Sequence, residues 1–142
     1  RGFLLPRMLK QFKVVPALLL NGLIWGLWHV PLTIMGHNYG VGYPGYPFTG
    51  IVAMCLFCIA NGIILSYITI KTKSCIPAIM GHGTLNGFAS VGLLFTSLDH
   101  PYNVFLGPAP TGLIGGAGFI VLAGVLLYLL YKEEKEGKEF AF

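Results

Sequence analysis

Residues 14–70 read VVPALLLNGLIWGLWHVPLTIMGHNYGVGYPGYPFTGIVAMCLFCIANGIILSYITI, a run of 57 residues without Lys, Arg, Asp or Glu. Over the whole 142-residue chain 55% of the residues are hydrophobic and 10% are charged, against about 25% charged in a typical soluble domain. A soluble fold needs polar side chains over most of its helices or strands, so this composition excludes a soluble globular domain. The net charge is +4, and the Lys and Arg residues lie beside the apolar runs rather than in a basic stripe. Nucleic-acid binding is therefore not expected. The sequence predicts a membrane protein with several spans.

Hydropathy predicts four membrane-spanning helices in a single all-α membrane domain that covers residues 1–142. The predicted spans are residues 14–34, 50–70, 75–95 and 112–130. Each has about 20 residues, the length that crosses about 30 Å of hydrocarbon. The runs are continuously apolar rather than alternating, which favours a multi-span helical bundle over a barrel.

The basic residues predict the orientation of this bundle. They lie before the first span, between the second and third spans, and after the fourth: Arg1, Arg7, Lys10, Lys13, Lys71, Lys73, Lys132, Lys135 and Lys138. The two other connections, residues 35–49 and 96–111, contain no Lys or Arg. Because basic residues mark the cytoplasmic side, we expect both ends of the chain to be cytoplasmic, including a tail at residues 132–142.

Small and polar residues inside the spans predict how the helices pack. Pairs of glycines four residues apart predict close contacts between helices, and these pairs are Gly22 with Gly26, Gly83 with Gly87, and Gly112 with Gly116. A hydrogen bond between helices is the simplest explanation for Asn61. Pro31 cannot donate to the carbonyl of Leu27, so the helix is expected to weaken beside His29. An odd number of cysteines in apolar surroundings predicts small buried side chains rather than disulfides: Cys55, Cys58 and Cys75.

Two ionisable side chains, His29 and His82, lie well inside the predicted spans, and such residues are functional candidates by default. Trp25 lies four residues before His29, and Asn86 lies four residues after His82, so each pair shares a helix face. Histidine can act as an acid, a base or a ligand, and an asparagine amide can stabilise an oxyanion. No span contains Asp or Glu, so a hydrolase built on these residues needs one more carboxylate to polarise water.

The depths of the two histidines set a geometric condition for a shared site. In straight helices His29 lies about 20 Å beyond Pro16, whereas His82 lies about 8 Å beyond Pro77. The two side chains would then miss each other by about 12 Å. They meet only if the first helix starts outside the hydrocarbon, tilts strongly or sits lower than the third. A separation above about 12 Å would contradict a shared site.

The sequence resembles the CPBP family of intramembrane proteases, which includes the type II CAAX prenyl endopeptidases and the bacterial Abi-like proteins. The family pattern is Glu-Glu-x-x-x-Arg, then Phe-x-x-x-His, then His-x-x-x-Asn or His-x-x-x-Asp. Arg1 stands where the first motif ends, Trp25–His29 matches the second with Trp in place of Phe, and His82–Asn86 matches the third unchanged. The resemblance extends to about Leu94, and the last span adds only a compatible topology.

This resemblance implies an intramembrane endopeptidase that hydrolyses a peptide bond in a membrane-tethered protein or peptide, such as a prenylated CAAX-type substrate. It implies His29, His82 and Asn86 as catalytic residues, with Arg1 and Trp25 supporting the motifs. It also implies a water-activating Glu before Arg1, so we expect this chain to be the C-terminal part of a longer protein and to be inactive alone. The expected location is a prokaryotic cell membrane. The reaction is compatible either with no cofactor or with a divalent metal such as zinc, held by the two histidines and the Glu.

Three other functions remain open at this point. A catalytically silent relative could keep the fold as a scaffold or immunity-type membrane protein. Two Glu at the positions five and four residues before Arg1 would favour an enzyme over that alternative. Two membrane histidines could also be axial ligands of a haem, which an absorption spectrum would reveal. The last alternative is a transporter.

Overall fold

The computed structural model describes residues 1–96 and 103–140, and this part of the chain is helical without strands. The elements in chain order are α1 (Leu4–Gln11), α2 (Val14–Trp28), α3 (Val30–Ile34), α4 (Phe48–Thr72), α5 (Ile76–Phe88), the 3₁₀ helix η1 (Val91–Phe95) and α6 (Leu113–Lys135). The predicted all-α fold is confirmed for these residues. The connection predicted at residues 96–111 lies partly outside the described residues, as do the last two residues of the predicted tail.

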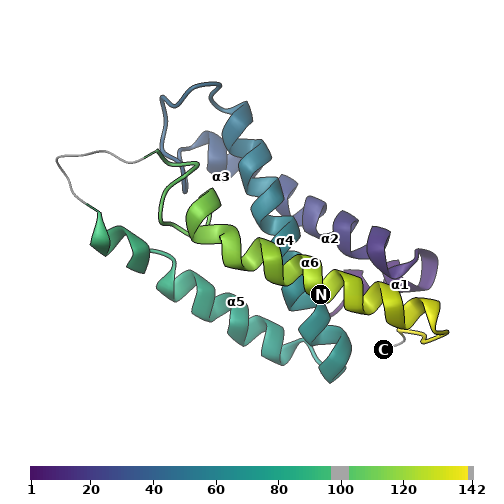
Figure 1. Cartoon of the computed structure of the whole chain (residues 1–142). Coiled ribbons are helices and arrows are strands. Elements are labelled where there is room, and N and C mark those ends of the chain that lie inside the picture. The colour runs from purple at the N-terminus through teal and green to yellow at the C-terminus, as the bar shows by residue number, and fades with distance from the viewer. Residues whose placement is uncertain (97–102, 141–142) are drawn as a thin grey trace.

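Helix α4 is the centre of the arrangement. It packs against α2 on one side and against α5 and α6 on the other (Figure 1). Two clusters of buried apolar side chains lie between the elements of the bundle other than α5. The larger cluster joins α1, α2, α4 and α6, and its fully buried members are Leu5, Val14, Ala17, Leu18 and Leu130. The smaller cluster lies around Tyr39, Met54 and Cys58.

The crossing of α2 and α4 depends on two glycines of α2. A Cβ atom built on Gly22 would lie 2.6 Å from the Cα of Ile59, and one built on Gly26 would lie 2.6 Å from the Cα of Cys55. Both distances are shorter than real Cβ contacts allow. The contact predicted from the spacing of Gly22 and Gly26 is therefore confirmed, because only glycine lets these backbones approach so closely.

The other two glycine pairs do not bring helices together. Among the residues that the structure describes, Cβ atoms built on Gly83 and Gly87 would meet nothing within 4 Å. One built on Gly116 would lie 2.7 Å from the carbonyl oxygen of Pro110, and Gly112 similarly faces the carbonyl of Gly107. The last pair therefore packs against the segment that enters α6 rather than against another helix, so the spacing alone predicted the wrong partner.

Helix lengths agree with only part of the predicted spans. Helices α4 and α6 are long and apolar enough to cross a membrane, whereas α2 is a shorter apolar helix. The expected helix at residues 14–34 is interrupted at His29. Pro31, two residues later, lacks the N–H that would continue the backbone hydrogen bonds of the helix. The expected helix at residues 75–95 ends at Phe88 and continues only as η1. Hydropathy did not indicate these breaks, because the residues around them are equally apolar.

The outer surface of the helices is apolar over large areas. Exposed large side chains include Ile114 at 72% and Val121 at 68% on α6, Met80 at 68% on α5, and Leu56 at 63% on α4. A water-soluble protein rarely exposes contiguous apolar surface of this extent. This surface is suited to contact with hydrocarbon.

One end of the bundle is joined by polar contacts. The carboxylate of Glu134 accepts a hydrogen bond of 2.6 Å from the backbone N–H of Val14, at the start of α2. The ammonium of Lys71 forms an ion pair with Glu133, and its distance to Oε2 is 2.6 Å. Lys138 also approaches Glu133, at 3.6 Å. These contacts link the ends of α2, α4 and α6 at the end of the molecule that carries most of the basic residues.

Aromatic side chains join the opposite end. The ring of Tyr39 stacks on that of Phe105 with centres 5.3 Å apart, and Tyr43 meets the same ring edge-on at 5.1 Å. The Tyr39 hydroxyl donates to the carbonyl of Thr111 at 3.3 Å. The loop between α3 and α4 is therefore packed against the segment that enters α6.

Candidate active site

His29 lies at the break between α2 and α3. Its backbone N–H donates to the carbonyl of Gly26 at 3.0 Å, so the carbonyl of Trp25 loses the partner that a continuous helix would give it. The imidazole takes that place, because His29 Nδ1 lies 3.0 Å from the Trp25 oxygen. Since a carbonyl only accepts, Nδ1 carries the proton in this contact and Nε2 presents a lone pair. The Sγ atom of Cys58 on α4 lies 3.7 Å from Nδ1.

The indole of Trp25 brings the two predicted histidines into one site. Its ring centre lies 5.9 Å from that of His29 and 5.0 Å from that of His82. The two imidazole centres are therefore no more than about 11 Å apart, which meets the condition set by the sequence for a shared site. Both imidazoles contact the ring of Trp25, which lies one turn before His29.

Helix α5 carries the other half of the predicted site. His82 is half-buried against the edge of Trp25, and Asn86 is exposed one turn further along the helix. Gly81 places α5 beside α4, because a Cβ atom there would lie 3.3 Å from the Leu65 side chain. The surface around Asn86 stays open within residues 1–96 and 103–140, since no atom of this part would meet a Cβ on Gly83. This arrangement leaves room for a substrate beside the His82–Asn86 face.

Arg1 contributes a buried positive charge to the same place. Its guanidinium carbon lies 4.8 Å from the centre of the Trp25 ring, and a Cβ atom on Gly62 would lie 3.7 Å from its Nη2. The Nε and Nη2 atoms are buried and have no hydrogen-bond partner among the described residues. Burying guanidinium donors without acceptors is costly. The site is therefore suited to an anionic group beside Arg1.

The two histidines do not complete a metal site by themselves. Within residues 1–96 and 103–140 no group of three or more His, Cys, Asp or Glu side chains is arranged to hold a metal ion. Catalytic zinc usually has three protein ligands, and the described residues present no such set. The arrangement also differs from haem ligation, because an indole packs against both imidazoles that would have to face one iron atom.

Sequence reasoning named Arg1 as a motif residue but missed its contact with Trp25, and it missed two neighbours of the site on α4. Spacing along the chain did not indicate that Arg1 would lie over Trp25, or that Cys58 and Gly62 of α4 would face these groups. All three cysteines are free, as expected. The close contact predicted for Gly22 and Gly26 of α2 is the one signal that could have placed this side of α4 next to the site.

These observations describe a helical protein with apolar helices able to cross a membrane, in which two histidines from different helices flank a tryptophan beneath a buried guanidinium. The family model of the Rce1-like type II CAAX prenyl endopeptidases matches residues 1–88, which are more than half of the chain. The chain belongs to the Rce1-like type II CAAX prenyl endopeptidase family. The matched region contains all five residues predicted for the site and its motifs. No curated protein and no solved structure matches the chain.

Proposed function

We propose that this chain forms most of the active site of an intramembrane endopeptidase that cleaves a prenylated CAAX-type substrate. Membership of a protease family supports peptide-bond hydrolysis. The contact of His29 and His82 with one indole is the observation that carries the assignment to this site. Both imidazoles lie among apolar helices, where groups with acid–base chemistry are rare unless they have a function.

Each polar residue of the site has a proposed role. A Glu that precedes Arg1 in the parent protein activates the attacking water, and His29 receives or relays its proton through Nε2. The lone pair of Nε2 is available for this because Nδ1 is bonded to the Trp25 carbonyl. His82 and Asn86 stabilise the oxyanion that forms at the scissile carbonyl.

The guanidinium of Arg1 supports the placement of this Glu. Two of its nitrogens are buried without an acceptor among the described residues, and a carboxylate is the acceptor that a guanidinium binds best. An Arg1–Glu pair would also keep the Glu ionised and able to act as a base. The catalytic carboxylate would then lie on the same indole as both histidines.

We further propose that the chain crosses a prokaryotic cell membrane four times, with both ends in the cytoplasm. In this topology α4 and α6 are continuous spans, whereas α2 with α3 and α5 with η1 are interrupted spans. Non-helical backbone at membrane depth is tolerated where it lines a site within the protein. The break at His29 is a place of this kind.

The test is cleavage of a labelled prenylated peptide by the full-length protein in liposomes. His29→Ala and His82→Ala are each expected to abolish turnover while leaving expression and folding intact. His37→Ala is the matched control, because His37 is exposed in the loop after α3, and it is expected to keep full turnover. Retained turnover in either site variant would refute the assigned role.

Two additions to this assay settle the remaining choices. Loss of turnover in a chelator, followed by recovery with zinc, would indicate a metal-dependent mechanism. Unchanged turnover would indicate a metal-free glutamate mechanism. A wild-type protein that cleaves neither prenylated nor unprenylated membrane peptides would instead be a catalytically silent member of the family.

A further inference from the structure

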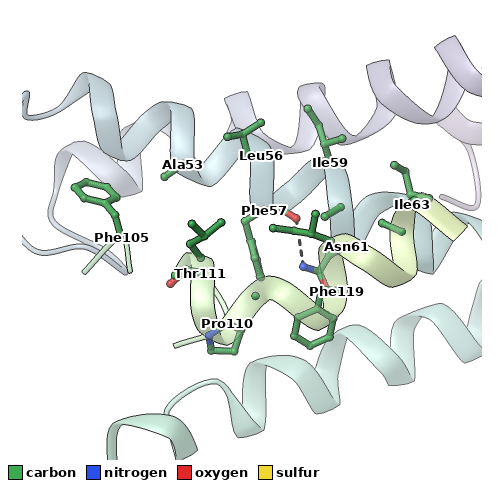
Figure 2. Close-up of a pocket in the computed structure, with 17 residues that line it drawn as sticks. Ala53, Leu56, Phe57, Ile59, Asn61, Ile63, Phe105, Pro110, Thr111 and Phe119 are labelled. Atoms are coloured by element: carbon green, nitrogen blue, oxygen red, sulfur yellow. Dashed lines mark hydrogen bonds between the residues drawn. The ribbon is translucent and has the colours of Figure 1, made fainter. Parts of the chain in front are cut away.

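A half-open cavity of about 480 Å³ lies between α4 and α6, away from both histidines. It is lined almost entirely by carbon atoms (Figure 2). Its lining comes from α4, from the segment before α6 and from α6 itself, and it includes Phe57, Asn61, Phe119 and Gly124. Neither His29, His82 nor Asn86 belongs to this lining, so the cavity is separate from the candidate active site.

Asn61 is the polar side chain in the middle of this lining. It is only 3% exposed, and its amide Nδ2 donates to the carbonyl of Phe57 in its own helix at 3.2 Å (Figure 2). The predicted hydrogen bond from Asn61 to another helix is therefore wrong within the described residues. Because one amide proton and Oδ1 remain available, the side chain offers the cavity both a donor and an acceptor.

The shape of the cavity limits what it can hold. Its α4 lining extends from Ala53 to Ile63, which is about 15 Å along a helix. Both helices present apolar side chains along this length, which suits an extended hydrocarbon chain.

We propose that this cavity binds a long-chain alcohol, with its hydroxyl at Asn61 and its hydrocarbon chain along α4 and α6. A hydroxyl both donates and accepts, which matches the two available groups of the amide. An apolar pocket with a small number of polar groups is the usual form of a small-molecule site. This inference does not depend on the proposed protease activity, because it uses no residue of the histidine site.

The test uses the full-length protein in liposomes and a diazirine derivative of dodecanol as a photoaffinity probe. Labelled peptides are expected to come from the cavity-lining parts of α4 and α6, around Phe57 and Phe119. Dodecanol should compete with the probe at a roughly tenfold lower concentration than dodecane, because only the alcohol bonds to the buried amide. Farnesol, tested in parallel, shows whether the site prefers an isoprenoid or a saturated alcohol.

Variants distinguish the cavity from the general lipid surface. Asn61→Leu keeps the side-chain size and is expected to remove the preference for dodecanol over dodecane. Gly124→Leu places a side chain at the lining without a clash, since a Cβ there meets nothing within 4 Å, and it should lower labelling at least tenfold. Gly118→Leu is the matched control, because Gly118 is equally open on α6 but lies outside the lining.

Three outcomes would overturn the proposal. The first is equal labelling of the Gly124→Leu and Gly118→Leu proteins. The second is an unchanged preference for dodecanol in the Asn61→Leu protein, with helix content by circular dichroism showing that the variant is folded. The third is absence of labelling in the wild-type cavity, which would mean that another part of the protein covers it.

Discussion

Trp25 is the residue that holds the candidate site together. Its ring contacts His29 and His82 and lies beneath the guanidinium of Arg1. Removing the ring would take away the aromatic contact of His82 and open a space between α2 and α5, whereas His29 would keep its hydrogen bond to the backbone carbonyl of residue 25. At the residue scale the indole is therefore a positioning group, which acts on the reaction through the two histidines.

Replacement of Trp25 gives a direct test of this positioning role. We expect Trp25→Ala to lower kcat by about 10²-fold, because a displacement of about 1 Å in a catalytic group has an effect of this size. Trp25→Phe keeps an aromatic ring against both histidines and should retain most of the activity. The measurement is kcat and KM for the prenylated peptide, and equal activity of the two variants would contradict the role.

Asn86 tests the other side of the site. If its amide stabilises the oxyanion, Asn86→Ala should lower kcat by about 10²–10³-fold and change KM little. Thr84→Val is the control, because Thr84 is exposed on α5 but lies two residues from both His82 and Asn86 and faces elsewhere. A similar loss in both variants would point to a disturbed helix rather than to a lost hydrogen bond.

The sequence was sufficient to predict which residues form this site, but it did not indicate which of them contact one another. His29 and His82 stand out because the spans contain no Lys, Arg, Asp or Glu, and the helical period places Asn86 on the His82 face. The position of Arg1 over Trp25 depends on how α1, α2 and α4 pack together. Such long-range contacts have no local signal in the chain.

At the scale of the elements, the contact between α2 and α4 controls where His29 lies. We expect Gly26→Ala to destabilise the protein by about 1–3 kcal/mol, since its methyl group would meet the backbone at Cys55. The same change at Gly118, where a Cβ meets nothing, should be neutral or stabilising by up to about 1 kcal/mol. Unfolding in detergent measures both, and equal effects would contradict the predicted close contact.

The break between α2 and α3 is the second feature at this scale. Pro31→Ala restores an N–H that can donate to the Leu27 carbonyl, so α2 can continue through His29. The backbone N–H of His29 would then compete with its own Nδ1 for the Trp25 carbonyl. We expect an unchanged or higher unfolding temperature together with at least a tenfold loss of kcat, and full activity would show that the break is not required.

For the whole molecule, polar and aromatic contacts gather at opposite ends of the helices. The pairs of Lys71 with Glu133 and of Glu134 with the Val14 N–H lie at one end, and the rings of Tyr39 and Phe105 lie at the other. The grouping of the basic residues could be predicted from the sequence alone. The particular pairs could not, because an exposed ion pair contributes little energy and leaves no pattern in the sequence.

This polarity leads to a prediction about the orientation of the chain. Helix α4 has 25 residues, or about 37 Å, which exceeds the hydrocarbon thickness of about 30 Å. Its two ends can therefore lie on opposite sides of the membrane.

Labelling of single cysteines tests the orientation in a protein without its native cysteines. Cysteines at Lys10, Lys73 and Lys135 should react with an impermeant maleimide only after the membrane is permeabilised, because these positions are predicted to be cytoplasmic.

Single cysteines at the exposed positions Val41 and Leu106 should react in intact cells, because they lie in connections without Lys or Arg. The first interrupted span separates Lys10 from Val41, and the second separates Lys73 from Leu106. Labelling of Lys10→Cys and Val41→Cys from the same side would mean that α2 and α3 do not cross the membrane. The same result for Lys73→Cys and Leu106→Cys would exclude a crossing by α5 and η1. Each interrupted span is thus tested separately from the two continuous helices.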